Sequence, residues 1–212
     1  MNFITSVLLC CLLTTISYAQ TETWELRSDK DGILAYTKDV PSTKFKEYLV
    51  ETDITADFSQ VLALFKDFES YPDLFPDTGD VKAYIDEPDR HVTYIRFKLP
   101  FPIKDRDAVM DQRISFDAEK RLLTIDVQCE AEDYETNKKL IRITDCGGAW
   151  EFKDRGDGTI HVKHNFLVDP GGAAPAWIVN SKVTKDPIKT LTSLRELVVQ
   201  DRYKGKQFDL LD

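Results

Sequence analysis

The 212-residue sequence is poor in the side chains from which metal centres and redox sites are built. It has three histidines and four cysteines, and two of the cysteines, Cys10 and Cys11, fall in an apolar N-terminal run. Cys129 and Cys146 lack CxxC spacing, and no histidine clusters with them. We therefore expect no zinc site, no redox motif and no cofactor. The predicted strands do not place Cys129 opposite Cys146, so we expect two buried thiols, although a disulfide is chemically allowed in an exported protein.

Basic residues are outnumbered by acidic ones, 28 to 37, which gives a formal net charge of −9 at pH 7. A nucleic-acid-binding domain needs a basic face, so we expect no nucleic-acid partner. The same charge disfavours long-range attraction to an anionic membrane. A local patch that makes transient membrane contact stays open.

The sequence also lacks the motifs of phosphate loops and nucleophilic serines. Neither Gly147-Gly148 nor Gly171-Gly172 has GxGxxG or Walker spacing, and no serine stands in a nucleophile elbow. The charged run over residues 104–107 is most simply a solvated, salt-bridged loop. No internal repeat, low-complexity segment or linker divides the chain. No catalytic set is predicted.

The first 19 residues have the pattern of a cleaved secretory signal. Residues 3–16 form an uncharged apolar run that is short for a membrane span, and small residues follow it up to Ala19. No Lys or Arg precedes the run, which leaves a retained membrane anchor as the alternative. Cleavage after Ala19 leaves residues 20–212, the length of one domain. We expect this domain to be monomeric and exported, either to the periplasm or to the extracellular space.

Apolar periodicity predicts an α+β domain. Asp57 is a suitable N-cap for a helix to residue 67, and apolar residues at steps of three and four predict a long helix over residues 177–199, kinked at Pro187. Short connections make the sheet antiparallel, and the long helix must bury its apolar face on that sheet. The polar tail after Tyr203 is expected to fray. Alternation and turn residues predict strands over residues 33–40, 45–54, 80–86, 91–99, 107–116, 121–130, 138–145, 150–155 and 159–168.

Three polar residues interrupt the apolar face of this sheet. Thr93, Gln112 and His164 fall in register with apolar residues that face the helix. A buried polar group without a partner costs roughly 1–3 kcal/mol, so each must bond to a neighbour, a water or a ligand. For either Gln112 or His164 alone, a partner within the protein is the simpler interpretation. Two such groups on one concave surface favour a hydrated cavity.

Several segments, taken in order, resemble a START (steroidogenic acute regulatory protein-related lipid transfer) domain. They are Trp24 with Asp-Gly-Ile at 31–33, Asp-Phe-Glu-Ser-Tyr-Pro at 67–72, Pro-Phe-Pro-Ile-Lys-Asp-Arg-Asp at 100–107, and Asp-Pro-Gly-Gly at 169–172 leading to Pro175, Trp177 and Asn180. The resemblance implies a helix-grip fold, in which a curved antiparallel sheet wraps the C-terminal helix and encloses an apolar tunnel for one lipid-like ligand. It also implies that residues 169–175 and the turn near Phe101 border the entrance.

The resemblance places the arginine of the family's Asp-Arg-Asp motif at Arg106. A second basic position common in the family falls at Gln112 or Arg113. Because alternation puts Gln112 inside, this chain lacks the second buried charge, and headgroup recognition cannot be carried over. Gly171-Gly172 would give the connection to the helix backbone freedom. Trp177 would either anchor the helix on the sheet or line the entrance.

We therefore expect a non-enzymatic, exported protein that binds a lipid or another hydrophobic small molecule, with transfer as an open extension. Two alternatives remain: an enzyme on the same fold, like the related aromatase/cyclases, with His164 as acid–base group and Gln112 orienting substrate, and a structural protein with a filled core. The predicted ligand-cavity residues are Thr93, Phe97, Arg106, Met110, Gln112, Cys129, Trp150, His164, Phe166 and Trp177.

Overall fold

The computed structural model describes residues 23–99, 101, 103–130 and 134–212. The predicted signal, residues 1–19, lies outside this range, as do Pro100 and Pro102 of the proline-rich turn. No helix within the described ranges is long and apolar enough to cross a membrane.

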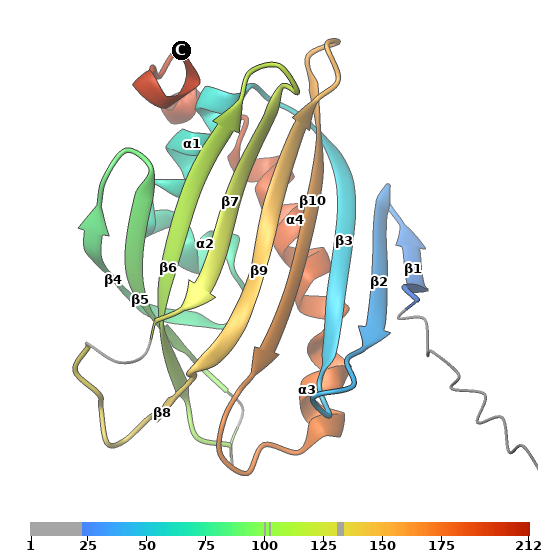
Figure 1. Cartoon of the computed structure of the whole chain (residues 1–212), viewed down its shortest axis with the longest axis vertical. Helices are drawn as coiled ribbons and strands as arrows, with labels where there is room; N and C mark the ends of the chain where they lie inside the picture. Colours follow the sequence, from blue (N-terminus) through green and yellow to red (C-terminus); the bar gives the residue numbers. More distant parts are fainter. Residues whose placement is uncertain (1–22, 100, 102, 131–133) are drawn as a thin grey trace, which may run out of the picture.

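A curved sheet grips the C-terminal helix (Figure 1). Nine strands lie in the order β1-β2-β3-β10-β9-β7-β6-β5-β4, each antiparallel to its neighbours, and a short β8 pairs in parallel with β6. The predicted α+β architecture with a C-terminal helix inside a curved antiparallel sheet is thus confirmed. The strands are β1 (Glu25–Lys30), β2 (Ile33–Asp39), β3 (Lys46–Thr55), β4 (Thr78–Asp86), β5 (Arg90–Phe97), β6 (Arg106–Asp117), β7 (Leu122–Cys129), β8 (Ile141–Arg142), β9 (Asp145–Asp154) and β10 (Thr159–Asp169).

The first helix begins where the sequence predicts. The Asp57 side chain accepts a hydrogen bond from the Gln60 backbone, and the Gln60 side chain accepts one from the Asp57 backbone, which forms a capping box. Helix α1 (Phe58–Phe65) then buries Val61, Leu62 and Leu64. The 3-10 turn η1 (Phe68–Ser70) and helix α2 (Tyr71–Leu74) follow it and lead into β4.

The main core lies between the inner face of the sheet, helix α1 and the last α-helix, α4 (Lys185–Leu197). Leu191 and Leu194 of α4 are fully buried, as are Val50, Ile125 and Phe152 of the sheet. Burying one such side chain contributes roughly 1.5–3 kcal/mol relative to leaving it exposed. The alternation that predicts the inner face is therefore confirmed at these strands.

The predicted strand over residues 138–145 is wrong, and so is the gap before the strand predicted to begin at residue 150. Within residues 138–145 only β8 and Asp145, the first residue of β9, are strand, and Gly147 and Gly148 lie inside β9. The reason is that β9 pairs with β7 from Gln128 opposite Gly147 onward. This register brings Cys129 beside Cys146, and the two form a disulfide with Cα atoms 5.1 Å apart, so the expectation of two free thiols is also wrong.

The predicted C-terminal helix is broken in two. Helix α3 (Ala176–Lys182) ends before α4 begins at Lys185. Pro187 has no N–H to donate to the carbonyl of Val183, four residues earlier, so the helix restarts and leaves Pro187 in its first turn. None of the residues of α3 is buried, and Trp177 is 75% exposed.

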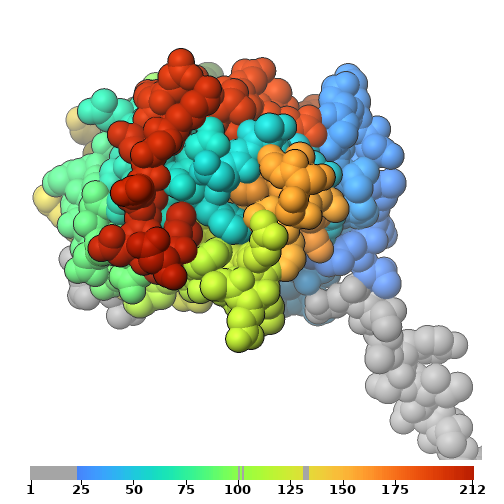
Figure 2. All heavy atoms as spheres, turned by 90° about the horizontal axis from the view of Figure 1, so that it is seen from above, coloured from blue at the N-terminus to red at the C-terminus, as the bar shows by residue number. Residues whose placement is uncertain are grey.

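The C-terminal tail does not fray as expected. The 3-10 turn η2 (Asp201–Tyr203) buries Tyr203, whose hydroxyl donates to Asp67, and η3 (Asp209–Leu211) contacts β6. Phe208, Leu210 and Leu211 pack against the main core. In the end view of Figure 2 the tail lies as a red band across this end of the molecule, between the green and cyan segments.

Candidate ligand cavity

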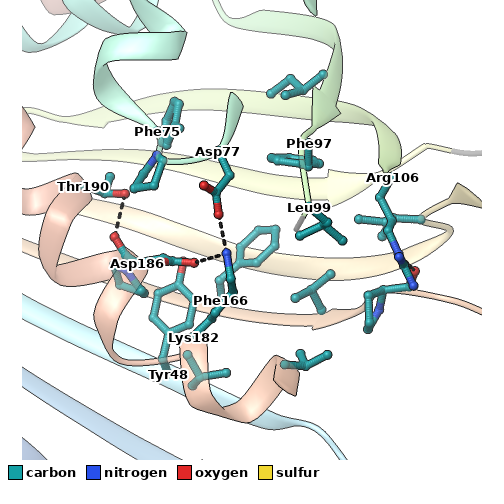
Figure 3. Close-up of a pocket in the computed structure, with 18 of the residues that line it drawn as sticks. Tyr48, Phe75, Asp77, Phe97, Leu99, Arg106, Phe166, Lys182, Asp186 and Thr190 are labelled. Atoms are coloured by element: carbon teal, nitrogen blue, oxygen red, sulfur yellow. Dashed lines mark hydrogen bonds and ion pairs between the residues drawn. The ribbon is translucent and has the colours of Figure 1, made fainter. Parts of the chain in front are cut away.

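An apolar cavity opens between the sheet, α2 and the broken helix (Figure 3). Its volume is about 300 Å³, at the lower end of the range for small-molecule sites. The sheet lines it with apolar residues that include Ile95, Phe97 and Phe166, and the helices cover it with Ile178 and Val183. A core filled completely by side chains, one of the alternatives from the sequence, does not describe this protein.

Seven of the ten predicted cavity residues line this space, namely Phe97, Arg106, Met110, Gln112, Trp150, His164 and Phe166. Three do not. Thr93 is buried behind Gln112 and accepts a hydrogen bond from its amide at 2.9 Å. Cys129 is in the disulfide. Trp177 points away from the cavity lining into solvent, although its neighbours Ile178 and Val179 line the wall.

Arg106, the first residue of β6, places a buried guanidinium at the cavity wall. Only 3% of it is exposed, and its guanidinium donates to the backbone carbonyls of Lys104 and Pro170. Burial lowers the pKa of Arg106, an effect that Asp105 opposes, but a guanidinium stays charged in proteins. No carboxylate of a residue in the described ranges forms an ion pair with it.

The two aspartates that flank Arg106 are engaged by other arginines. Asp105 accepts from Arg96 at 2.7 and 3.1 Å, and Asp107 accepts two bonds of 3.0 Å from Arg142. The charged run is therefore salt-bridged, as the sequence suggests, but Arg106 is excluded from the pairing and turned inward. A buried cation without a counter-ion is costly unless something else accepts its hydrogen bonds. The structure thus leaves Arg106 as a group that favours a ligand acceptor or anion.

His164 lies on the cavity wall in an aromatic setting. Its ring stacks on Trp150 with centroids 3.7 Å apart and meets Tyr48 edge-on at 5.2 Å. Its Nδ1 is 3.0 Å from the Ala149 carbonyl oxygen and its Nε2 is 2.7 Å from the Tyr48 hydroxyl. Burial lowers the pKa of His164 to about 3, so the ring is neutral at ordinary pH. Both ring nitrogens are already engaged.

A second polar cluster holds the broken helix over the cavity. Lys182 at the end of α3 pairs with Asp77, which precedes β4, and with Asp186 of α4 at 3.5 Å. Burial opposes the charge on Lys182, but the hydrogen bond to Asp77 raises its pKa. On the other side of α3, Asn180 accepts from the backbone N–H of Lys46 at 3.1 Å and donates to the Lys44 carbonyl. Polar contacts rather than buried apolar side chains therefore tie α3 to the sheet.

Sequence reasoning missed Tyr48, Asp77, Lys182 and Asp186 as cavity residues. Tyr48 could have been found, because it alternates with the inward Val50 and Ile54 of β3. The i,i+4 spacing of Lys182 and Asp186 is also a readable signal of a helix pair. The pairing with Asp77 spans 105 residues, and no local pattern indicates it.

The described residues of this cavity do not form a metal-binding cluster. Across the described residues, no group of three or more His, Cys, Asp or Glu side chains could hold a metal ion. The available polar groups are instead suited to hydrogen bonding within an apolar surround.

Comparison with known proteins assigns the chain to a family. Residues 54–192, well over half of the chain, match the model of the polyketide cyclase / dehydrase and lipid transport family. The chain belongs to this family. A relative with 28% identity over 190 residues, 90% of this chain and 94% of its own length, is an uncharacterized protein of Pseudomonas aeruginosa.

Solved structures show which fold this member of the polyketide cyclase / dehydrase and lipid transport family has. A STAR-related lipid transfer protein from Xanthomonas axonopodis superposes with a TM-score of 0.78 at 24% identity, over 84% of this chain and 99% of that one. Human StAR-related lipid transfer protein 5 gives 0.69 at 13% identity, over 85% and 88%. These likenesses establish a START-like helix-grip fold.

Proposed function

We propose that this protein binds a lipid or a similar hydrophobic small molecule in its cavity and carries it without chemical change. The observation that carries the proposal is the buried guanidinium of Arg106 at the wall of a mainly apolar cavity, where no described residue forms an ion pair with it. Such a site suits an amphipathic molecule whose polar end accepts hydrogen bonds from Arg106 while its apolar body fills the cavity. Two structures of similar fold are named as lipid transfer proteins, which is in keeping with this role.

The geometry of His164 favours a carrier over an enzyme that uses this residue. A general base must have a free nitrogen within reach of the substrate proton. In His164 one nitrogen faces the Ala149 carbonyl and the other faces Tyr48. The cyclase-like alternative would require His164 to give up one of these bonds.

We also propose that the protein works outside the cytoplasm. The Cys129–Cys146 disulfide supports an oxidising compartment, since cytosolic thiols are kept reduced. The apolar pattern of the first 19 residues supports the same location.

Transient contact with a membrane is the route by which we propose that ligand enters and leaves. Phe101 is 97% exposed between Leu99 and Ile103, which line the cavity, and the exposed Trp177 precedes the lining residue Ile178. Exposed aromatics beside a cavity mouth favour the interface of a lipid bilayer. The net charge of −9 makes apolar insertion a better driving force than attraction to anionic lipid.

Native mass spectrometry of purified protein, followed by solvent extraction, tests the binding proposal. We expect a monomer that carries a small hydrophobic adduct, and we expect Arg106→Met to lose ligands with an acceptor or anionic end while it keeps purely apolar ones. Protein that is always free of adduct and takes up nothing from mixed lipid vesicles would refute the proposal.

Flotation with phosphatidylcholine vesicles tests the membrane route. The double variant Phe101→Ser, Trp177→Ser should bind the vesicles less and exchange ligand more slowly. Leu26→Ser, which removes an exposed apolar side chain from β1, is the matched control and should behave like the parent. Equal losses in both variants would argue against a docking role for the mouth.

A further inference from the structure

A short chain of hydrogen bonds with a fixed direction reaches the cavity through Tyr48. The Ala149 carbonyl oxygen, the two ring nitrogens of His164 and the Tyr48 hydroxyl follow one another at 3.0 and 2.7 Å. Ala149, Trp150 and His164 lie on the adjacent strands β9 and β10, where Trp150 is opposite His164. The stack of His164 on Trp150 holds the imidazole plane in place.

The carbonyl sets the direction of every bond in this chain. A carbonyl oxygen can only accept, so the Nδ1 of His164 must carry the hydrogen. A neutral imidazole has one N–H, which leaves Nε2 as a bare acceptor. The Tyr48 hydroxyl therefore donates its only hydrogen to His164. The lowered pKa of His164 agrees with a neutral ring.

Tyr48 consequently offers the cavity an acceptor and no donor. Its oxygen keeps lone pairs that its bond to His164 does not use. Within the part of the chain that the structure describes, no other residue forms a hydrogen bond with this oxygen. Burial and the charge of Asp186 both raise the pKa of Tyr48, so it does not ionise into a phenolate.

Among the other charged groups of the cavity wall, Asp77 and Asp186 are acceptors that Lys182 engages. Arg106 has only donors. The amide N–H₂ of Gln112 already donates to Thr93, and Lys182 is held by Asp77 and Asp186. In Figure 3 Tyr48, Lys182 and Asp186 are drawn together, with Arg106 at the opposite side of the view and apolar residues such as Phe97 and Leu99 between them. The cavity thus has an acceptor region and a donor region, divided by apolar wall.

We propose that Tyr48 is a specificity-determining residue that selects ligands with a neutral hydrogen-bond donor, an alcohol hydroxyl in the first instance, at the Tyr48 end of the cavity. The proposal rests on the proposed function and adds the chemistry of one ligand group to it. A deprotonated carboxylate has no hydrogen to give, and at this end it meets two carboxylates, Asp77 and Asp186, against the single positive charge of Lys182 that they already engage. An ether or a hydrocarbon leaves the Tyr48 oxygen without its second bond.

Competition between two matched probes tests the selection. Dodecan-1-ol and dodecyl methyl ether differ in the hydroxyl hydrogen and one methyl group. Each is titrated against delipidated full-length protein loaded with a fluorescent apolar dye, and displacement gives the relative affinities. A single hydrogen bond contributes about 0.5–1.5 kcal/mol, so the parent should prefer the alcohol by roughly two- to tenfold.

Tyr48→Phe keeps the ring and removes the hydroxyl, which is both the acceptor offered to the ligand and the donor to His164. It should lose affinity for the alcohol, keep its affinity for the ether and abolish the preference. Tyr36→Phe on β2 is the matched control: alternation with the buried Ala35 and Thr37 turns Tyr36 to the other face of the sheet, so the preference should persist. A purely structural role of Tyr48 would weaken alcohol and ether equally.

His164→Leu supplies a second, independent arm. Without the ring acceptor, the Tyr48 O–H is free to donate, and the preference should shift toward the ether or a ketone of equal length. Thermal melting verifies that each variant is folded, and the Tyr48→Phe arm decides the question if His164→Leu does not fold.

The outcomes separate this inference from the proposed function. An unchanged alcohol preference in Tyr48→Phe, or no preference in the parent, overturns the role of Tyr48 while ligand binding stands. Failure of the parent to bind the dye, the alcohol or the ether overturns both.

Discussion

Gly148 of β9 lies directly opposite Phe166 of β10, and the Phe166 ring fills the space that a side chain on Gly148 would need. A Cβ at this position would come within 2.0 Å of the Asn165 carbonyl oxygen and 2.7 Å of the Phe166 ring. Because Phe166 also lines the cavity, this glycine shapes the wall from behind.

Overpacking typically costs about 1–3 kcal/mol. Because the Gly148 contacts are closer than any normal Cβ contact, Gly148→Ala should lower the free energy of unfolding by roughly 3 kcal/mol or more. Urea unfolding followed by tryptophan fluorescence measures the loss. Gly147→Ala is the control, because its Cβ would meet only the Val127 carbonyl at 3.5 Å, an ordinary contact. Similar stabilities for the two variants would contradict the close approach of Phe166.

Loss of the Cys129–Cys146 disulfide should lower stability by about 3 kcal/mol. The bond closes a loop with a sequence separation of 17 residues, and in the loop-entropy account a cross-link of this length stabilises by that amount. Denaturation curves with and without dithiothreitol measure the effect in the parent. The variant Cys129→Ser, Cys146→Ser should match the reduced parent and show no response to the reductant.

Stability should fall as the pH drops from 7 to 5, because two buried histidines resist protonation. Burial lowers the pKa of His164 to about 3, and burial with the nearby Lys66 lowers that of His91 to about 4. The unfolded chain binds these protons near pH 6.5 and the folded chain does not, so protonation favours unfolding. Each histidine should cost about 2 kcal/mol over this interval.

His164→Asn removes one of the two groups that bind a proton in the unfolded chain but not in the folded protein. Its free energy of unfolding should depend less on pH by about 2 kcal/mol between pH 7 and pH 5. Urea titrations at the two values suffice. A pH dependence equal to that of the parent would mean that His164 is protonated in the folded protein.

Ligand release should be faster when the polar contacts of α3 are weakened. Lys182→Met removes the pairs with Asp77 and Asp186. Partly exposed pairs of this kind contribute little to global stability, about 0–1 kcal/mol, so the melting temperature should change little. Stopped-flow transfer of a fluorescent lipid to acceptor vesicles measures the release rate.

Lys189→Met on α4 is the control for Lys182→Met. Lys189 is also near Asp186, at 3.8 Å, but it does not tie α3 to the strand side of the cavity. Its release rate should equal that of the parent. Equal acceleration by both variants would indicate a general effect of charge rather than a contact that holds the helix.

Alternation and turn chemistry predicted most of the fold and part of the site. The inward placement of Gln112 and His164 followed from strand periodicity alone, because one face of each strand must be buried. The N-cap at Asp57 and the hairpins were equally local. Arg106, by contrast, came from the family resemblance, since alternation does not reveal that its neighbouring aspartates bind Arg96 and Arg142.

The features that sequence reasoning missed depend on contacts distant in the chain. The disulfide needed the register of β7 on β9, which skips the segment between them. The hydrogen bond between Tyr48 and His164 joins residues that are 116 positions apart in the sequence. Gly171 and Gly172 adopt the left-handed conformation at φ 66° and 60° beside Ile141, where an L side chain would be strained.

The lack of any buried residue in α3 has a consequence for how the cavity responds to its surroundings. The polar contacts that hold α3 are the ion pairs of Lys182 and the hydrogen bonds between the Asn180 side chain and the backbone of residues 44 and 46. Ion pairs at a surface weaken as salt screens them. Occupancy of an entirely apolar ligand should therefore depend on ionic strength. Low ionic strength would favour retention of the ligand in the cavity, and high ionic strength would favour its release.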